Sequence, residues 1–438
     1  MNYKCSNNIR FRHIVFSVLV SLVLVVPCGV FAGSLADLYQ LALENDPQLK
    51  RAEAEFLAGQ EAPIQGRAGL LPRADFSANT TRQTQSLNDG LSVYTVRLSQ
   101  PVFNANSYFN FKRSELVADN SVVRFEKAEQ EVIIRSVEAY LQVLRSMSAV
   151  DNAHAQERAL QRRFDQVSAQ FDVGLIAIAD VQEARAAYDL ATVNRIDAQS
   201  NLVKSYEALE SLAGQAFDHI SYLSPNFPIV PVEPISPNVW IEKALEGNLD
   251  LRSANIESQI SRRNTQGVAA NRLPEISLGL AHENRRTHGG FDDKWDENNS
   301  IQLSMSVPLF TSGGLSSQQR QAQHEQMASV QVVEHVRRSV IENTRALLRT
   351  LHISAQGVQA RQQNIISRET ALRATEEGFN FGTRNIVDVL QAEQSLFEAR
   401  QAYENARIDH ISALFKFKQV IGTLSPDDLF SLDQWLVD

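Results

Sequence analysis

The chain has 438 residues, and 42 Lys and Arg against 51 Asp and Glu give it a formal charge of −9. This acidic balance argues against a nucleic-acid-binding surface. The mean hydropathy is −0.24 and only one stretch is apolar enough to enter a bilayer as a helix, which excludes a protein with several transmembrane helices. With two cysteines, the chain cannot form a disulfide scaffold or a cysteine-based zinc site.

The first 32 residues have the pattern of a secretory signal peptide. Basic residues precede an apolar run over 14–26, and small residues follow at Val30 and Ala32, where a signal peptidase would read them. We expect cleavage after Ala32, which removes both cysteines, three basic residues and no acidic one, so the charge falls from −9 to −12. The alternatives are an uncleaved anchor helix, for which the apolar run is short, and a lipid on Cys28, which Pro27 disfavours.

Six landmarks recur in the same order about 200 residues later, which indicates two repeats with one layout. For example, Ala42-Leu43-Glu44 recurs as Ala244-Leu245-Glu246, and Leu71-Pro72 recurs as Leu273-Pro274. Prolines at every third position from Pro225 to Pro237 favour an extended connector between the repeats. The expected units are the signal peptide (1–32), repeat one (33–224), a proline-rich linker (225–237), repeat two (238–422) and a C-terminal segment (423–438).

Two long stretches without proline, 102–224 and 309–425, are rich in helix-forming residues and predict long helices. A glycine-containing turn interrupts each one, at 173–175 and at 381–383, so each repeat is expected to hold a long helix, a tip and a returning helix. A single helix over 104–172 would be roughly 100 Å long, more than a compact domain needs. Apolar and small residues recur every seven positions on the returning helices, which predicts coiled-coil packing, with an ordinary antiparallel bundle as the alternative.

A short segment with period-two alternation lies before each long helix. Four such strands are expected, near 74–80, 94–99, 276–280 and 301–307, and this alternation is typical of transmembrane β-strands. Polar loops are expected to join them, over 83–90 and over 285–299; we interpret the acidic cluster at 292–297 as part of a solvated loop, with a cation site as the alternative. Four strands cannot close a barrel, and lipid does not tolerate open sheet edges, so several copies must pool their strands in a cyclic homo-oligomer.

These features together resemble the TolC family of outer-membrane channel proteins over nearly all of 33–425. The motifs that carry the resemblance are the two tips and the helix starts after them: Phe171-Asp172-Val173-Gly174-Leu175, Ala179-Asp180-Val181-Gln182 and FGTRNIVDVL at 381–390. The resemblance implies a mixed α+β membrane protein, a homotrimer whose chains each supply four strands to a twelve-stranded β-barrel. This barrel would continue into a long periplasmic α-helical barrel of coiled-coil helices, with the linker 225–237 and the segment 423–438 in an equatorial collar.

The resemblance also implies an exit duct in outer-membrane lipid for type I protein secretion, multidrug efflux or both. Its partners would be a periplasmic adaptor (membrane fusion) protein and an inner-membrane transporter, either ABC or proton-driven. The adaptor is expected at the tips, because turns that expose apolar side chains offer contacts at the end of the tube: Val173, Gly174, Leu175, Phe381, Gly382 and Thr383. Plain helix turns without a docking role are the alternative.

In this family, polar links between helices and a ring of acidic side chains narrow the tube near the tips. The resemblance therefore implies a periplasmic gate formed by Asp180, Arg368, Arg373, Glu376 and Glu377. Glu376 and Glu377 would form the acidic ring, repeated threefold by symmetry. Arg373 stands where an Asp is common in the family, so an ion pair between Arg368 and Asp180 is one rewired link. The alternative is that these are ordinary solvated helix charges.

Nothing in the sequence supports catalysis. The nine histidines lack metal-protease spacing, no nucleophile-elbow motif is present, and no glycine-rich loop follows a strand, so we expect no enzyme activity, no cofactor and no metal. A periplasmic adaptor and a coiled-coil structural protein of the cell envelope remain as alternatives. The first would not need two matched strand pairs, and the second would lack both the strands and the tip motifs.

Overall fold

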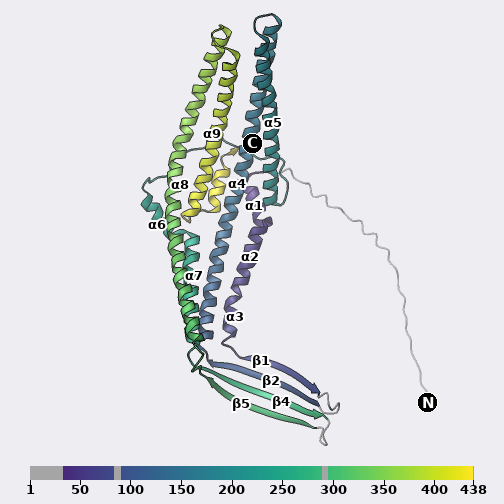
Figure 1. The fold of residues 1–438 in the computed structure, drawn as a ribbon, viewed down its shortest axis with the longest axis vertical. Helices are drawn as coiled ribbons and strands as arrows, with labels where there is room; N and C mark the ends of the chain where they lie inside the picture. The colour runs from purple at the N-terminus through teal and green to yellow at the C-terminus, as the bar shows by residue number, and fades with distance from the viewer. Residues whose placement is uncertain (1–32, 83–89, 289–293, 438) are drawn as a thin grey trace, which may run out of the picture.

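The computed structural model describes residues 33–82, 90–288 and 294–437, so the expected signal peptide lies outside the described residues. The chain is strongly elongated, with a four-stranded sheet at one end and two helical tips at the other (Figure 1). Two long hairpins connect these ends. They are formed by α4 (Ala105–Asp172) with α5 (Ile178–Ala213), and by α8 (Gly314–Asn380) with α9 (Ile386–Val420).

The two long helices confirm the expectation drawn from the proline-free stretches: α4 has 68 residues and α8 has 67. Helix α4 begins where the Asn104 side chain accepts a hydrogen bond from the backbone N–H of Ser107. It ends at Asp172, just before Gly174, whose φ of +76° turns the chain back. Of the helices in the described ranges, none is both long enough and apolar enough to cross a membrane.

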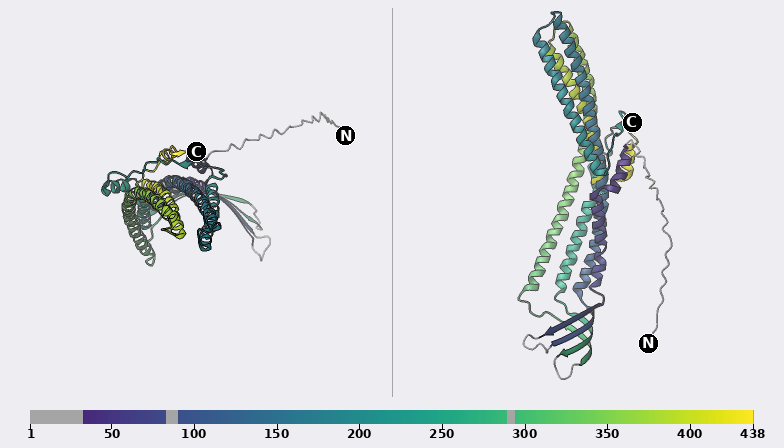
Figure 2. Two further views of the ribbon diagram at one scale, coloured as in Figure 1. Left: turned by 90° about the horizontal axis from the view of Figure 1, so that it is seen from above. Right: turned by 90° about the vertical axis from the view of Figure 1, so that its right-hand side faces the viewer.

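The four hairpin helices lie side by side in a curved row (Figure 2, left). Helix α4 packs against both α5 and α9, and α9 packs against α8, so the order across the row is α5–α4–α9–α8. Nearer the sheet, shorter helices take the places of α5 and α9 beside α4 and α8. These are α2 (Pro47–Gln60), α3 (Ala62–Ala68) and α7 (Leu249–Ala270).

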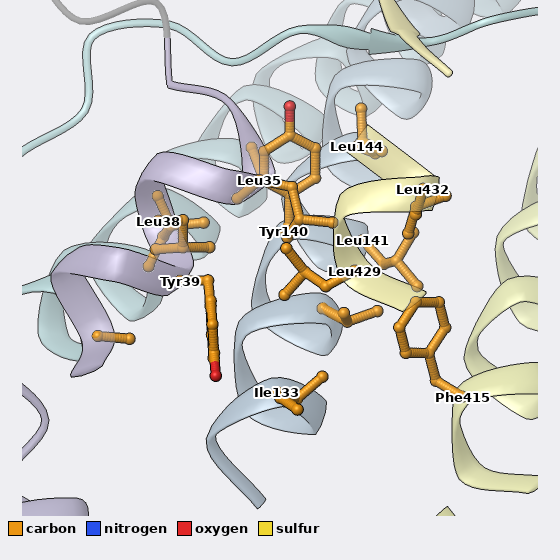
Figure 3. Close-up of a cluster of buried hydrophobic side chains, with 14 of the residues drawn as sticks. Leu35, Leu38, Tyr39, Ile133, Tyr140, Leu141, Leu144, Phe415, Leu429 and Leu432 are labelled. Carbon is orange, nitrogen blue, oxygen red and sulfur yellow. The ribbon is translucent and has the colours of Figure 1, made fainter. Parts of the chain in front are cut away.

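Three further helices and a small strand pair surround the middle of the row. They are α1 (Leu35–Asn45), α6 (Pro237–Gly247) and α10 (Pro426–Asp433), with β3 (Tyr222–Leu223) paired to β6 (Leu436–Val437). The largest core of the described chain lies here, where α1 and α10 cover α4 and α9 (Figure 3). At its centre Tyr140 is almost fully buried, and its hydroxyl donates a 3.0 Å hydrogen bond to the Ser221 carbonyl oxygen.

The sheet is antiparallel, in the order β1 (Arg73–Arg82), β2 (Gly90–Phe103), β4 (Glu275–His288) and β5 (Trp295–Ser306). Its register places residues of one character in rows across all four strands. One row is apolar, and the next row, on the opposite face, is mostly polar: Ala74, Leu98, Leu280 and Ile301, then Asp75, Arg97, Ala281 and Ser300. In the part nearer the helices, the sheet therefore has one apolar and one polar face, and β1 and β5 are its two edges.

The expected polar loop over 285–299 was wrong, because β4 continues to His288 and β5 already begins at Trp295. Residues 289–293, and also 83–89 in the other expected loop, lie outside the described residues. Polar residues continue the ladder: Arg285 pairs with Asp296, and the Arg286 guanidinium lies over the Trp295 ring, 5.5 Å from its centroid. Polar strand ends lack hydrophobic alternation, so the sequence pattern ended before the strands did.

Candidate functional site at the helical tips

The first tip joins α4 to α5 in a tight turn over 173–177. The N–H of Gly174 donates to the Phe171 carbonyl oxygen at 2.8 Å, and the N–H of Leu175 donates to that of Gln170 at 2.9 Å. These bonds close the end of α4 and leave the neighbouring side chains in solvent. Val173 is 71% exposed and Leu175 is 74% exposed. The predicted tip residues therefore form an apolar projection at the end of the hairpin.

The second tip, over 381–385, joins α8 to α9 in a similar way. Gly382 has a φ of +73°, and the hydroxyl of Thr383 donates to the Gly378 carbonyl oxygen at 2.9 Å. Helix α9 then starts with a capping box formed by Asn385 and Asp388. Phe381 is 81% exposed. Both tips thus present apolar side chains from turns that hydrogen bonds hold in place, and they lie at the same end of the molecule (Figure 1).

A small apolar core joins the two hairpins just behind the tips. It contains buried side chains from α4, α5 and α9: Val167, Val181, Ala184, Ile386 and Val389. Phe164 and Phe379 pack against it from the two long helices. Because each hairpin contributes to this core, the two tips are held beside each other as one unit.

A charged cluster lies next to this core, on the side towards the middle of the long helices. Arg163 of α4 forms ion pairs with Glu376 of α8 and with Glu393 of α9, and the second of these is 2.9 Å long. The Arg163 and Glu393 side chains are only 10% and 6% exposed. Burial raises the pKa of the Glu393 carboxyl, and the charge and hydrogen bond of Arg163 limit this rise. This Arg163 cluster ties the first hairpin to both helices of the second.

The predicted gate residues are only partly brought together. Glu376 enters the Arg163 cluster, whereas Arg368, Arg373 and Glu377 are exposed on α8. Within the described part of this single chain, no ion pair joins Arg368 to Asp180, which lies in the first turn of α5. A link between these two residues across a subunit boundary stays a prediction.

Sequence reasoning missed Arg163 and Glu393. The only available signal was position: Glu393 directly follows Ala392, which belongs to the sevenfold series of small residues on α9. A charge beside a packed seam needs a partner, but the periodicity does not say on which helix the partner lies. Among the described residues, no group of three or more His, Cys, Asp or Glu is placed to hold a metal ion.

The family model of the outer membrane efflux protein matches residues 38–215 and 240–423. The chain is 32% identical to outer membrane protein TolC of Vibrio cholerae over 416 residues, which cover 93% of this chain and 95% of that protein. It is 30% identical over 417 residues to the alkaline protease secretion protein AprF of Pseudomonas aeruginosa, covering 91% of this chain and 86% of AprF.

Solved structures agree on the fold. The outer membrane protein VceC of Vibrio cholerae matches with a TM-score of 0.76 at 18% identity, over 89% of this chain and 96% of VceC. The MtrE outer membrane channel of Neisseria gonorrhoeae, solved in an open state, matches with a TM-score of 0.73 at 19% identity, over 90% and 91%. With its paired strands, long hairpins and tips matched over almost its whole length, the chain belongs to the outer membrane efflux protein family.

Proposed function

We propose that three copies of this chain form an outer-membrane exit duct of a tripartite export system. The observation that carries this proposal is the division of the molecule into two ends with different surfaces. One end is a sheet with an apolar face and a polar face, and the other is a pair of apolar tips on long hairpins. AprF is named as a secretion protein and the matching family as an efflux protein, which supports export as the activity.

The sheet supports a barrel shared between subunits. Its apolar face would meet lipid and its polar face would line a wet lumen, the arrangement expected of a transmembrane β-barrel. Strands β1 and β5 have no partner on their outer sides within the described chain, so each needs a strand from another copy. A ring of three would give twelve strands, as the family resemblance implies.

The helical part would form the periplasmic tube, built from the two repeats 33–224 and 238–422. The linker 225–237, together with α6, α1 and α10, would form a collar at mid-length. The shape of the single chain supports this, because these segments gather around the middle of the helical row (Figures 1 and 2). An adaptor or a coiled-coil protein of the envelope is the weaker alternative, since neither needs a four-stranded sheet with opposite faces.

The tips would dock onto a periplasmic adaptor protein that is itself bound to an inner-membrane transporter. We expect Gly174→Leu to abolish export while trimers still reach the outer membrane. A Cβ at Gly174 would meet no heavy atom within 4 Å in the chain, so this change adds local backbone strain and bulk at the docking surface. Export assays paired with outer-membrane fractionation test this. Normal export by the variant would show that the tips are not the docking site.

The gate would combine the Arg163 cluster with an acidic ring from the exposed Glu377 of each copy. We expect Glu377→Gln to reduce the cation selectivity of single channels, because three carboxylates facing one lumen attract cations. Glu376→Gln should change selectivity less, since Glu376 is already paired with Arg163. Reversal potentials in a salt gradient measure this, and unchanged selectivity in both variants would reject the ring.

A further inference from the structure

Helix α5 carries an exposed apolar stripe along the free side of the helical row. Leu190, Val193, Ile196 and Val203 are each at least 52% exposed, although the opposite side of the helix is buried against α4. Their spacings of three and seven keep them on one side of a helix that supercoils with its neighbours. Two exposed acids, Glu183 and Glu207, lie at the two ends of this stripe. Neither acid has an ion pair within the described residues.

Helix α8 carries a matching edge at the other end of the row (Figure 2, left). Ile353 is 66% exposed and Ile366 is 53% exposed, and both lie away from the buried side that packs on α9. Two exposed basic residues, Arg349 and Arg373, lie just outside them. In the part of the chain that the structure describes, neither arginine has an ion-pair partner. One edge of the chain is therefore apolar and acidic, and the other is apolar and basic.

The two edges match in one antiparallel register. Val203 and Leu190 are thirteen residues apart on α5, and Ile353 and Ile366 are thirteen residues apart on α8. If Val203 lies opposite Ile353, then Leu190 lies opposite Ile366. The same register places Glu207 opposite Arg349 and Glu183 opposite Arg373. Two apolar contacts and two charge pairs thus follow from one choice of alignment.

A shift by one heptad, which keeps the same sides of both helices in contact, is unfavourable in either direction. In one direction Glu207 would face Glu342, and Lys204 would face Arg345, so like charges would meet. In the other direction Leu190 would face Arg373, and Glu207 would face Gln356. The charges therefore select the register as well as the partner, in the way that flanking charges do in coiled coils.

We propose that α5 of one copy and α8 of the next form an antiparallel seam in which Val203 meets Ile353, Leu190 meets Ile366, Glu207 pairs with Arg349 and Glu183 pairs with Arg373. The inference rests on the proposed oligomeric duct and specifies how its helical part closes. The interface is heterologous, since each copy contributes a different edge, and repeating it around an axis gives a closed ring.

A cysteine pair tests the register. The full-length double variant V203C/I353C is oxidised in isolated outer membranes, with the wild type and each single variant as controls. Each copy carries one introduced cysteine on α5 and one on α8, so disulfides can link three copies into a ring. We therefore expect most of the protein to run as a covalent trimer on a non-reducing gel. The matched control V203C/A360C moves the second cysteine by one heptad along α8 and should remain largely monomeric.

Charge reversal gives a second measurement that does not depend on disulfide geometry. We expect E207R and R349E each to lower the temperature at which trimers dissociate, and E207R/R349E to restore it. Trimers that form without cross-linking in V203C/I353C, or that cross-link better in V203C/A360C, would overturn the seam and leave the proposed duct standing. A wild-type protein that is monomeric in the outer membrane would overturn both.

Discussion

Replacing Arg163 by alanine is expected to loosen the packing of the helices behind the tips and to raise the conductance of single channels. The substitution leaves Glu393 buried without its positive partner and removes the two ion pairs that Arg163 makes with the second hairpin. Breaking a buried ion pair from one side costs about 3–5 kcal/mol, because the remaining charge stays buried. Conductance in planar bilayers and the thermal unfolding midpoint of the purified protein measure the two consequences.

The matched control is Arg158→Ala, which removes an exposed arginine from the same helix five residues earlier. It should change neither the conductance nor the midpoint, because surface charges contribute little. Glu393→Gln should be milder than Arg163→Ala, since it removes the buried charge and leaves Arg163 paired with Glu376. If Arg163→Ala behaves like Arg158→Ala, the cluster has no part in the proposed gate.

The effect of Arg163→Ala should also depend on pH. Burial raises the pKa of Glu393 in the folded chain, so its contribution to stability is fully present below the pKa of an unfolded glutamate, about 4.3, and is lost as pH rises through the folded value. Removing Arg163 raises this folded pKa further. The gap in stability between the wild type and Arg163→Ala should therefore be smallest near about pH 4 and widen towards neutrality.

Replacing Gly422 by alanine is expected to disrupt the middle of the molecule. Gly422 has a φ of +71°, and a Cβ there would lie 2.1 Å from the Gly247 carbonyl oxygen, which is a backbone atom that cannot rotate away. The left-handed backbone costs alanine about 1–2 kcal/mol, and displacing packed backbone adds roughly 1–3 kcal/mol. We expect a lower yield of folded protein and a lower thermal unfolding midpoint.

Gly174→Ala is the control that separates these two costs. Its φ of +76° imposes the same backbone strain, but no heavy atom lies within 4 Å of the added Cβ. Its midpoint should fall only by the amount that the strain requires. Equal midpoints for Gly422→Ala and Gly174→Ala would show that the contact between Gly422 and Gly247 does not hold α6 against the end of α9.

Local signals in the sequence were sufficient to predict the hairpins. Uninterrupted helix-forming residues end at Gly174 and Gly382, so the predicted long helix over 104–172 agrees with α4 to within one residue. The strands were found from alternation, but their polar ends were taken for loop, because Arg285 and Asp296 show no hydrophobic pattern and are stabilised by pairing across the sheet. The local sequence thus determines the backbone conformation clearly in the long helices and only weakly at the polar ends of the strands.

The Arg163 cluster could not be predicted in this way. It joins α4, α8 and α9, and its residues are more than 200 positions apart for either pair with Arg163. Periodicity identifies which side of a helix is buried, but it does not say which helix covers that side. The predicted gate therefore included Glu376, which pairs with Arg163, and did not include Arg163 or Glu393.

The backbone N–H of Leu35 donates a 2.8 Å hydrogen bond to the Asp433 carboxylate, so the first and last helices of the described chain meet halfway along the molecule. Between these two helices the chain runs twice from the middle to the sheet, on to a tip and back to the middle. The sheet and the tips are therefore internal parts of the chain, and the segments on both sides of each one lead back to the packed helices at mid-length. A force or torque applied at a tip is therefore carried by two antiparallel helices, and both helices transmit it to the same core at mid-length.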